Sequence, residues 1–443
     1  MQLSPVRRAH ATVAARFDAS PTAVWPLFDD FANAHGGSGA STEMLAAGSS
    51  RWIRRAPADL GVVEERRRSE DGLAAYRARV PGGSTFDDLD AVVRVSQEGE
   101  GSVVTWSTQS VGNRSASERE RLQQWLAQRL RSAGGTVLSP LTMDVWRGKY
   151  RTIARAGLDG GAAATWSPTT ATLVAGQRDA VLIDALMTAE EGDQLVEWIR
   201  TSGKRLRAVI ITQGQADHFF GLDQVLRAFP DVIATAVTDV AQYAQAQTQS
   251  VLKPRWETLF PGKLPTTVTA PSPLPAGSLD LEGHTLQLFD VGLIGERPTS
   301  VVSVRHLDAM IGGDLVYNRV HPWLIGTDRA ARQRWSRALD LVEALRPAWV
   351  IASHRDPDAD SDAALPQVEE HRRYLREFDE VLASASDAVS FVEEMVRRWP
   401  NHGNRSTLEA SAVAEFVGSR TLAPADYPDL LPQRNENERD VSE

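Results

Sequence analysis

The stretch TQGQADHFFG, Thr212 to Gly221, decides how the fold of this sequence is interpreted. It follows the apolar run LRAVIIT and leads into the helix-like run FFGLDQVLRAF. These flanking runs predict a strand, a short polar turn and a helix. In such an arrangement the side chains of the turn lie together at the end of the strand. Asp217 and His218 in the turn are metal-ligand types, yet both Gln213 and Gln215 are amides. The stretch therefore indicates a metal site, half of one, or the remains of one.

The composition of the 443 residues narrows the class of protein. The length favours two or three domains, and 42% apolar with 24% charged residues is typical of a soluble globular protein. No apolar run is long enough for a membrane span, and MQLSPVRRAHATVAARF lacks the apolar segment of a secretory signal. The absence of cysteine excludes disulfides and thiolate metal sites, and the net charge of −10 argues against nucleic-acid binding. We expect a cytoplasmic protein with a small-molecule partner and no membrane or nucleic-acid partner; the sequence does not indicate the oligomeric state.

Before residue 150, short alternating runs predict antiparallel strands: ATVAARF, SRWIRRA, AAYRARV, AVVRVS and SVVTWST. One helix is expected from an N-cap at Ser20 with Pro21 at its first position. A longer helix, at about 115–134, begins with the capping-box pair Ser115 and Glu118 and ends at a glycine pair. This pattern suits a curved antiparallel sheet wrapped around one long helix.

The segment FDASPTAVWPLFDDFANAHGG and the long helix at 115–134 resemble the Bet v 1-like helix-grip superfamily, which includes polyketide cyclases. The resemblance covers roughly residues 8–140 and predicts a helix-grip domain over 1–145. It implies an apolar cavity between sheet and helix. The aromatic side chains of this half either line that cavity or only fill a core: Trp25, Phe28, Phe31, Trp52, Tyr76, Trp106 and Trp125.

After residue 150 the pattern changes to strands alternating with helices, which predicts a layered α/β arrangement with mixed strand order. Within 141–165, the stretch GLDGGAAA fits a linker or an entering loop. We expect this second domain to cover 150–425, with C-terminal helices at about 366–418. The acidic tail, 426–443, is expected to be disordered.

Four pieces of this second half resemble metallo-β-lactamase-fold hydrolases in order and spacing. They are LIDAL with Asp184, TQGQADHFFG, GGDLVYNRVHPWL with Asp314, and VIASH with His354. The resemblance covers about 160–420 and implies an αββα sandwich with a C-terminal helical extension. The fold class predicted for the whole chain is therefore α+β.

The chain departs from this family at the first metal site. The family motif His-x-His-x-Asp-His stands here as Gln213, Gln215, Asp217 and His218. Leu293, in the loop VGLIGERPTS after the strand LQLFDV, lies where the resemblance places a third histidine. Amides are poor zinc ligands and leucine is none, so a two-metal centre is not expected.

The second site keeps its ligand types. By resemblance, Asp217, His218 and His354 are its three ligands and Asp314 the carboxylate that bridges two ions. Two imidazoles and two carboxylates suit one Zn²⁺, Fe²⁺ or Mn²⁺. The alternative is that no metal binds and the four residues are relics held by hydrogen bonds.

Tyr317 and His321, in the loop after Asp314, border the pocket by resemblance and are candidates for general acid or base. His321 alternatively packs the loop before Pro322. Gln213 and Gln215 either hydrogen-bond a substrate carbonyl or pair with each other, and we expect the pairing. We expect Asp184 to orient the metal loop by hydrogen bonds and not to ligate an ion. The remaining histidines considered are expected at the surface: His284, His306, His371 and His402.

Three functions are compatible with the sequence, and the first of them is the one we expect. The first is an enzyme that acts on an apolar ester, thioester or lactone, or catalyses a cyclisation or elimination, with one metal or none. The second is a non-catalytic lactamase-like scaffold joined to a small-molecule-binding or cyclase-type N-terminal domain. The third leaves only the helix-grip domain active, as a cyclase or carrier.

Overall fold

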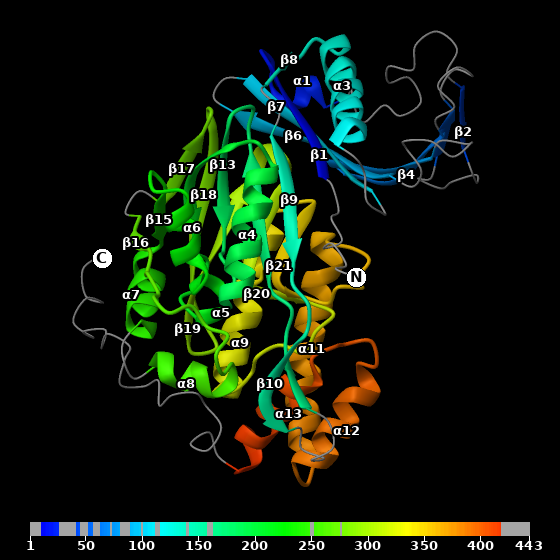
Figure 1. The fold of residues 1–443 in the computed structure, drawn as a ribbon. Coiled ribbons are helices and arrows are strands. Elements are labelled where there is room, and N and C mark those ends of the chain that lie inside the picture. The colour runs from blue at the N-terminus through cyan, green and yellow to red at the C-terminus, as the bar shows by residue number, and fades with distance from the viewer. Residues whose placement is uncertain are drawn as a thin grey trace, which may run out of the picture.

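The structure, a computed structural model of the chain, consists of two joined halves (Figure 1). It describes residues 10–25, 41–44, 52–55, 63–70, 73–79, 89–98, 101–110, 116–138, 141–156, 163–248, 252–274 and 277–417.

The N-terminal half is an antiparallel sheet with one long helix against it. Along the sheet the strands follow the order β1 (His10–Phe17), β7 (Gly101–Ser110), β6 (Leu89–Glu98), β5 (Leu73–Arg79), β4 (Val63–Glu70), β3 (Trp52–Arg55) and β2 (Ser41–Met44). The short strand β8 (Thr136–Val137) also pairs with β1. Helix α3 (Ala116–Ser132) lies over β1 and buries Leu126 and Leu130 against it. The expected antiparallel strands and the long helix are therefore present.

The aromatic residues proposed for an N-terminal cavity are only partly within the described residues. Trp106 is buried in the core between sheet and α3, and the half-buried Trp25 packs against that core. Phe28 and Phe31 lie outside the described ranges, as do the side chains of Trp52, Tyr76 and Trp125. The first helix, α1 (Pro21–Val24), begins after Ser20 as expected, and its predicted continuation also lies outside them.

The C-terminal half has two sheets face to face. The first continues through β9 (Thr142–Arg147), β12 (Thr170–Ala175), β13 (Asp179–Ile183), β14 (Arg205–Ile210), β15 (Ile233–Ala236) and β16 (Ser272–Pro273). The second has the order β17 (Ser278–Leu281), β18 (His284–Ile294), β19 (Arg297–Val304), β20 (Ala309–Asn318) and β21 (Trp349–Arg355). Strands such as β12 and β20 are buried at every position because each sheet has a layer on both faces.

Helices cover the outer faces of both sheets (Figure 1). The first group is α4 (Ala189–Thr201), α5 (Ala216–Phe219), α6 (Leu222–Ala228), α7 (Thr238–Gln247) and α8 (Leu252–Leu259). The second group is α9 (Arg329–Ala338), α10 (Asp340–Leu345), α11 (Ala364–Ser384), α12 (Ala388–Arg398) and α13 (Arg405–Val417). This is the expected αββα sandwich with a C-terminal helical extension.

Strand β9 joins the two halves into one sheet. It pairs with β12 along its length, and its first residues pair with β1 through His10–Met143 and Ala11–Thr142. The predicted end of the first domain, residue 145, therefore falls inside a strand. A buried ion pair between Arg94 of β6 and Asp308, after the 3₁₀ turn η1 (Arg305–Leu307), adds a second tie.

The stretch GLDGGAAA, expected to be a linker or an entering loop, lies outside the described ranges except for its last two residues, which begin β11. On either side of it, β10 (Arg151–Ala156) and β11 (Ala163–Trp166) pair as a separate hairpin that the sequence did not indicate. Both strands are too short and too poor in alternating apolar residues to be recognised without their partners. The tail, 426–443, lies outside the described ranges.

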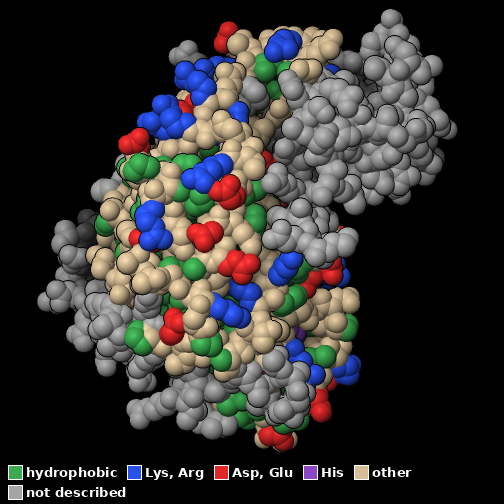
Figure 2. All heavy atoms as spheres, viewed as in Figure 1, with side chains coloured by type: hydrophobic (Ala, Val, Ile, Leu, Met, Phe, Trp, Pro, Cys, Tyr) green, Lys and Arg blue, Asp and Glu red, His purple; other side chains and the backbone are tan. Residues whose placement is uncertain are grey.

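Charged side chains of both signs are interspersed over the visible face of the C-terminal half (Figure 2), without a basic patch on that face. Within the described ranges, no helix combines the length and apolarity needed to cross a bilayer.

Candidate metal centre

Three neighbouring elements bring the candidate ligands together. Asp217 and His218 lie on α5, the single helical turn that follows the end of β14. Asp314 is on β20 and His354 on the parallel neighbour β21, where Tyr317 is in register with His354. All four side chains are at most 5% exposed. The sequence motif and two distant strands thus meet inside the sandwich.

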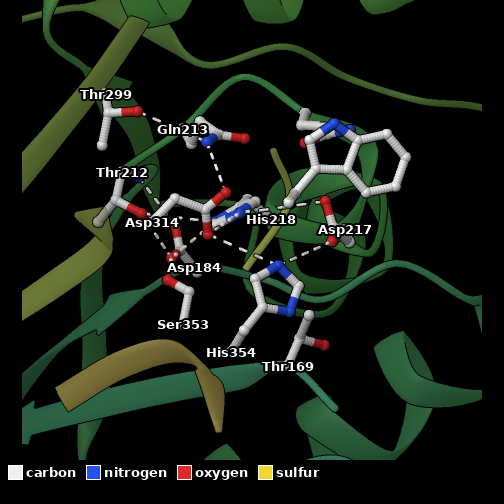
Figure 3. A network of polar contacts seen from close by, with 12 residues as sticks. Thr169, Asp184, Thr212, Gln213, Asp217, His218, Thr299, Asp314, Ser353 and His354 are labelled. Carbon is white, nitrogen blue, oxygen red and sulfur yellow. Dashed lines mark hydrogen bonds and ion pairs between the residues drawn. The ribbon is translucent and has the colours of Figure 1, made fainter. Parts of the chain in front are cut away.

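The ligand atoms of Asp217, His218 and His354 all lie within 4.8 Å of one another (Figure 3). His354 Nε2 is 3.3 Å from Asp217 Oδ2, and His218 Nε2 is 4.0 Å from Asp217 Oδ1. Asp314 Oδ1 closes the group, at 3.4 Å from His218 Nε2 and 3.5 Å from His354 Nε2. The structure therefore brings together all four residues predicted for the second site.

The donor atoms of this group fit a divalent cation. Asp217 Oδ1, His218 Nε2 and Asp314 Oδ1 are buried and have no hydrogen-bond partner among the described residues. Buried polar atoms without a partner are costly, and such atoms are normally satisfied by a ligand, water or ion. Two imidazoles with two carboxylates are a ligand set for Zn²⁺, Fe²⁺ or Mn²⁺.

Mutual charge interactions set the protonation of the group. Burial raises the pKa of Asp217, but the hydrogen bond from His354 and the charge of His218 outweigh it and lower the pKa to about 2. The pKa of Asp314 is lowered in the same way, against burial, by the charges of His218 and His354. Burial alone would lower the pKa of His218, yet Asp184 and Asp314 raise it well above its usual value. Both carboxylates are thus anionic, and metal binding would displace the proton of His218.

Asp184 fixes the orientation of His218, as the sequence predicted. It lies after β13 in the left-handed conformation (φ 60°) and accepts hydrogen bonds from Thr212 N and Thr212 Oγ1, at 2.8 and 2.7 Å. Its Oδ2 is 3.1 Å from His218 Nδ1 and accepts from Ser353 Oγ at 3.3 Å. With Nδ1 held outward, Nε2 of His218 faces the centre.

The two glutamines do not pair with each other, so that expectation is wrong. Gln213 Nε2 donates to Asp314 Oδ2 at 2.7 Å (Figure 3), whereas Gln215 Oε1 accepts from Arg297 Nη1 at 2.9 Å. Each amide therefore has a charged partner. Neither glutamine is more than 3% exposed.

Leu293, expected in a loop, lies instead near the end of a strand. It lies on β18, which continues beyond the predicted loop start, and it pairs with Pro298 of β19. An irregularity between Asp290 and Gly292 shifts the alternation of side chains, which leaves Leu293 41% exposed. The first residue of β19, Arg297, reaches Gln215 instead.

Two contributors to the site were missed by sequence reasoning. Trp166 donates its indole N–H to Asp217 Oδ2 at 3.0 Å, from the end of β11. Arg297 lies next to Gln215 and adds to the lowering of the pKa of Asp314. No local motif indicated either residue, because each contact joins positions far apart in the chain.

The two candidates for acid–base chemistry lie in different places. The ring of Tyr317 stacks on His354 with centroids 5.1 Å apart, and burial raises its pKa well above 10. His321 instead shares a hydrogen bond of 2.8 Å with the Tyr374 hydroxyl, and its ring lies beside His402. Its contacts are to the C-terminal helical extension, which matches loop packing.

The other histidines are not surface residues, contrary to expectation. His284 and His371 are buried, and His306 and His402 are half-buried. His284 and His306 share a hydrogen bond of 2.9 Å between their Nδ1 atoms, and His371 stacks on Tyr317. Amphipathic patterning alone did not separate inward from outward histidines.

Comparison with known proteins agrees with this geometry. Residues 164–354 match the family model described as the metallo-beta-lactamase superfamily. That segment begins in β11 and ends at His354, so it contains all four candidate ligands. A metallo-beta-lactamase superfamily domain therefore occupies the C-terminal half of this chain.

Solved structures that match part of this chain include the metallo-beta-lactamase FIM-1 from Pseudomonas aeruginosa in a mono-zinc form. It is 18% identical, with a TM-score of 0.38 over 54% of this chain and 91% of that one. A metallo-beta-lactamase from Pontibacter korlensis is 17% identical, with a TM-score of 0.40 over 53% and 94%. A search of curated proteins finds no match.

Proposed function

We propose that this protein is a metal-dependent hydrolase-type enzyme that works with a single divalent ion, zinc in the first instance. Its substrate would be an apolar small molecule with an ester, thioester or lactone bond, or one that undergoes a related cyclisation or elimination. The metallo-beta-lactamase superfamily domain supports the reaction class, and its altered motif supports the single ion.

One observation carries the proposal. Asp217, His218 and His354 converge within 4.8 Å, and two of their donor atoms are buried without a hydrogen-bond partner among the described residues. If these residues no longer bound a metal, we would expect neighbouring side chains to form hydrogen bonds with these buried atoms. The retained convergence therefore favours a bound ion over a vestigial cluster.

The residues of the chain would have separate roles. Asp217, His218 and His354 would hold the ion, with Asp314 beside them. A bound divalent ion would supply Lewis acidity, which polarises a carbonyl oxygen or makes water more acidic. Tyr317 stacks on His354 and keeps its proton because burial raises its pKa, so it is suited to donate a hydrogen bond to an oxygen of the substrate.

For residues 1–145 we propose a helix-grip domain that binds the apolar part of the substrate, followed by the lactamase-like domain over 150–425. The strand order β1-β7-β6-β5-β4-β3-β2 and the packing of α3 against β1 support this proposal.

Metal analysis of the purified full chain tests the assignment. We expect about one equivalent of zinc, iron or manganese in the parent protein, and its loss in the variants Asp217→Ala and His354→Ala. The exposed Asp358→Ala variant is the matched control and should keep its metal. A parent protein that stays metal-free after incubation with each ion would overturn the proposal.

A second candidate is a non-catalytic lactamase-like scaffold. The burial of all four candidate ligands favours it, because a catalytic centre must admit substrate. A screen of ester, thioester and lactone substrates separates the two. Turnover that is lost in His354→Ala supports the enzyme, whereas metal binding without turnover, beside ligand binding by the N-terminal half, supports the scaffold.

A further inference from the structure

The charges buried around the candidate centre do not balance by themselves. Asp184, Asp217 and Asp314 are each at most 2% exposed. Asp184 accepts four hydrogen bonds or close donor contacts, which is typical of a carboxylate in its charged form. Three buried negative charges require nearby positive charge, since an unpaired buried ion is strongly unfavourable.

Arg297 supplies one fixed positive charge to this group. It is 5% exposed, donates to Gln215 Oε1 at 2.9 Å, and lies over the ring of Trp323 at 5.5 Å. Its Nη2 also approaches the Trp323 carbonyl oxygen at 3.5 Å. These contacts hold the guanidinium beside Gln215, which stands at a first-site position of the motif.

Gln213 occupies one of the two oxygens of Asp314. Its amide donates to Asp314 Oδ2 at 2.7 Å, while the other oxygen, Oδ1, faces His218 and His354. One carboxylate oxygen is therefore directed toward the candidate ion and the other is occupied by an amide proton. A second ion on that side would have to displace this hydrogen bond.

A histidine that binds a metal is neutral, so His218 and His354 add no charge to the group when an ion is bound. Three carboxylates carry three negative charges, Arg297 carries one positive charge, and one divalent ion adds two. The group is then neutral. A second divalent ion would leave two uncompensated positive charges beside a buried guanidinium.

We propose that Arg297 is a fixed internal cation that takes the place of a second metal ion and restricts this centre to one. Gln215 positions its guanidinium, and Gln213 blocks the far oxygen of Asp314. The inference rests on the proposed single-ion function. It assigns a specificity-determining role to a residue outside the ligand set.

We expect Arg297→Gln to bind zinc more tightly than the parent protein. Removing the positive charge leaves the group more negative, so the remaining zinc ion should bind more tightly, on the order of tenfold or more. Arg297→Lys keeps the charge and should bind zinc as the parent does. If Arg297 were only structural, its loss would weaken zinc binding or leave it unchanged.

The stoichiometry provides the second readout. We would prepare Gln213→His/Gln215→His, with and without Arg297→Gln, to restore imidazole donors beside Asp314. The double variant should still bind one zinc ion because the guanidinium remains. The triple variant should bind two.

Zinc affinity would be measured on the metal-free full chain by competition with a chromogenic chelator, and stoichiometry by elemental analysis. Arg332→Gln is the matched control, since Arg332 is an equally buried arginine whose ion pairs are to Asp379 and Glu415. It should leave zinc affinity unchanged even if stability falls.

The outcomes separate this inference from the proposed function. One ion in the parent, with weaker or equal binding in Arg297→Gln, overturns the role of Arg297 and leaves the function standing. No ion in the parent but one in Arg297→Gln overturns the proposed function, and it also overturns the inference, because Arg297 would then exclude the first ion and not a second one. No ion in any variant overturns both.

Discussion

At the scale of single residues, Asp184 determines which nitrogen of His218 faces the centre. It is not one of the candidate ligands, yet its oxygens contact Thr212, His218 and Ser353. The left-handed backbone at Asp184, φ 60°, is one that asparagine tolerates well. Asp184→Asn can therefore remove the charge with little backbone strain.

We expect Asp184→Asn to lower zinc affinity about 10- to 100-fold, the usual effect of losing a carboxylate that orients a metal-bound histidine. Competition titration with a chelator measures this change. Asp280→Asn, which alters a carboxylate of β17 that accepts a hydrogen bond from Gly283 N, is the control and should bind zinc as the parent does. Parent-like affinity in Asp184→Asn would show that His218 does not need this partner.

His371 predicts a pH dependence of stability. Burial lowers the pKa of His371 to about 3, whereas the unfolded chain has a pKa near 6.5. Below about pH 6.5 the imidazole of His371 is protonated in the unfolded state but not in the native state. The free energy of unfolding therefore falls as the pH drops. We expect His371 alone to lower the free energy of unfolding by about 2 kcal/mol between pH 7 and pH 5.

The measurement is the free energy of unfolding in urea at pH 7 and pH 5, for the parent and His371→Gln. The variant can be less stable at both pH values, but its loss on acidification should be smaller by about 2 kcal/mol. The same loss in both proteins would mean that His371 titrates normally in the native state.

At the scale of elements, helix α7 packs directly on the loop between β14 and α5. A Cβ atom at Gly214 would lie 2.5 Å from Ala244 N and 2.7 Å from Val240 O, both backbone atoms of α7. The close approach requires glycine at this position. It also fixes the loop that carries both glutamines.

Gly214→Ala should therefore push α7 away and lower the free energy of unfolding by about 1–3 kcal/mol. Denaturant unfolding measures the loss. Gly262→Asn is the control, since Gly262 has open space around it and a positive φ that asparagine adopts. Equal stability of Gly214→Ala and the parent would contradict the tight packing of α7.

The same elements show how far the sequence could predict the site. Asp217 and His218 belong to a local strand–turn–helix pattern, so the sequence alone placed them. Trp166 contacts Asp217 across 51 positions and Arg297 contacts Gln215 across 82, and no local pattern encodes such pairs. The loop expected around Leu293 is instead part of β18, and the irregularity between Asp290 and Gly292 in that strand has no local sequence signal.

At the scale of the whole molecule, the pair of Arg94 and Asp308 ties the two halves together. The Arg94 side chain is 14% exposed and that of Asp308 is 3% exposed, with Nε and Oδ1 2.8 Å apart. Burial raises the pKa of Asp308 and the charge of Arg94 opposes that rise. Loss of the arginine would leave a poorly solvated carboxylate at the junction.

Arg94→Leu should lower the free energy of unfolding by about 1–3 kcal/mol, and Arg94→Leu/Asp308→Asn should recover most of that loss. Urea unfolding followed by fluorescence gives both values. A double variant no more stable than Arg94→Leu would show that the cost does not come from the unpaired carboxylate.

The continuous sheet through β9 could not be predicted from sequence for a related reason. The strand pairs His10–Met143 and Ala11–Thr142 join the two halves of the sheet, and they link residues more than a hundred positions apart. The local sequence pattern changes near residue 145, so the sequence predicted a domain boundary there. The pairing of β9 with both β1 and β12 depends on contacts between distant segments, which no local pattern reveals.

The central claim is that one divalent ion is held by Asp217, His218 and His354. Anomalous diffraction at the zinc edge, from crystals of the zinc-loaded full chain, tests it most directly. The account predicts a single peak among the carboxylate of Asp217, Nε2 of His218 and Nε2 of His354. Two peaks in this group, or none, would contradict it.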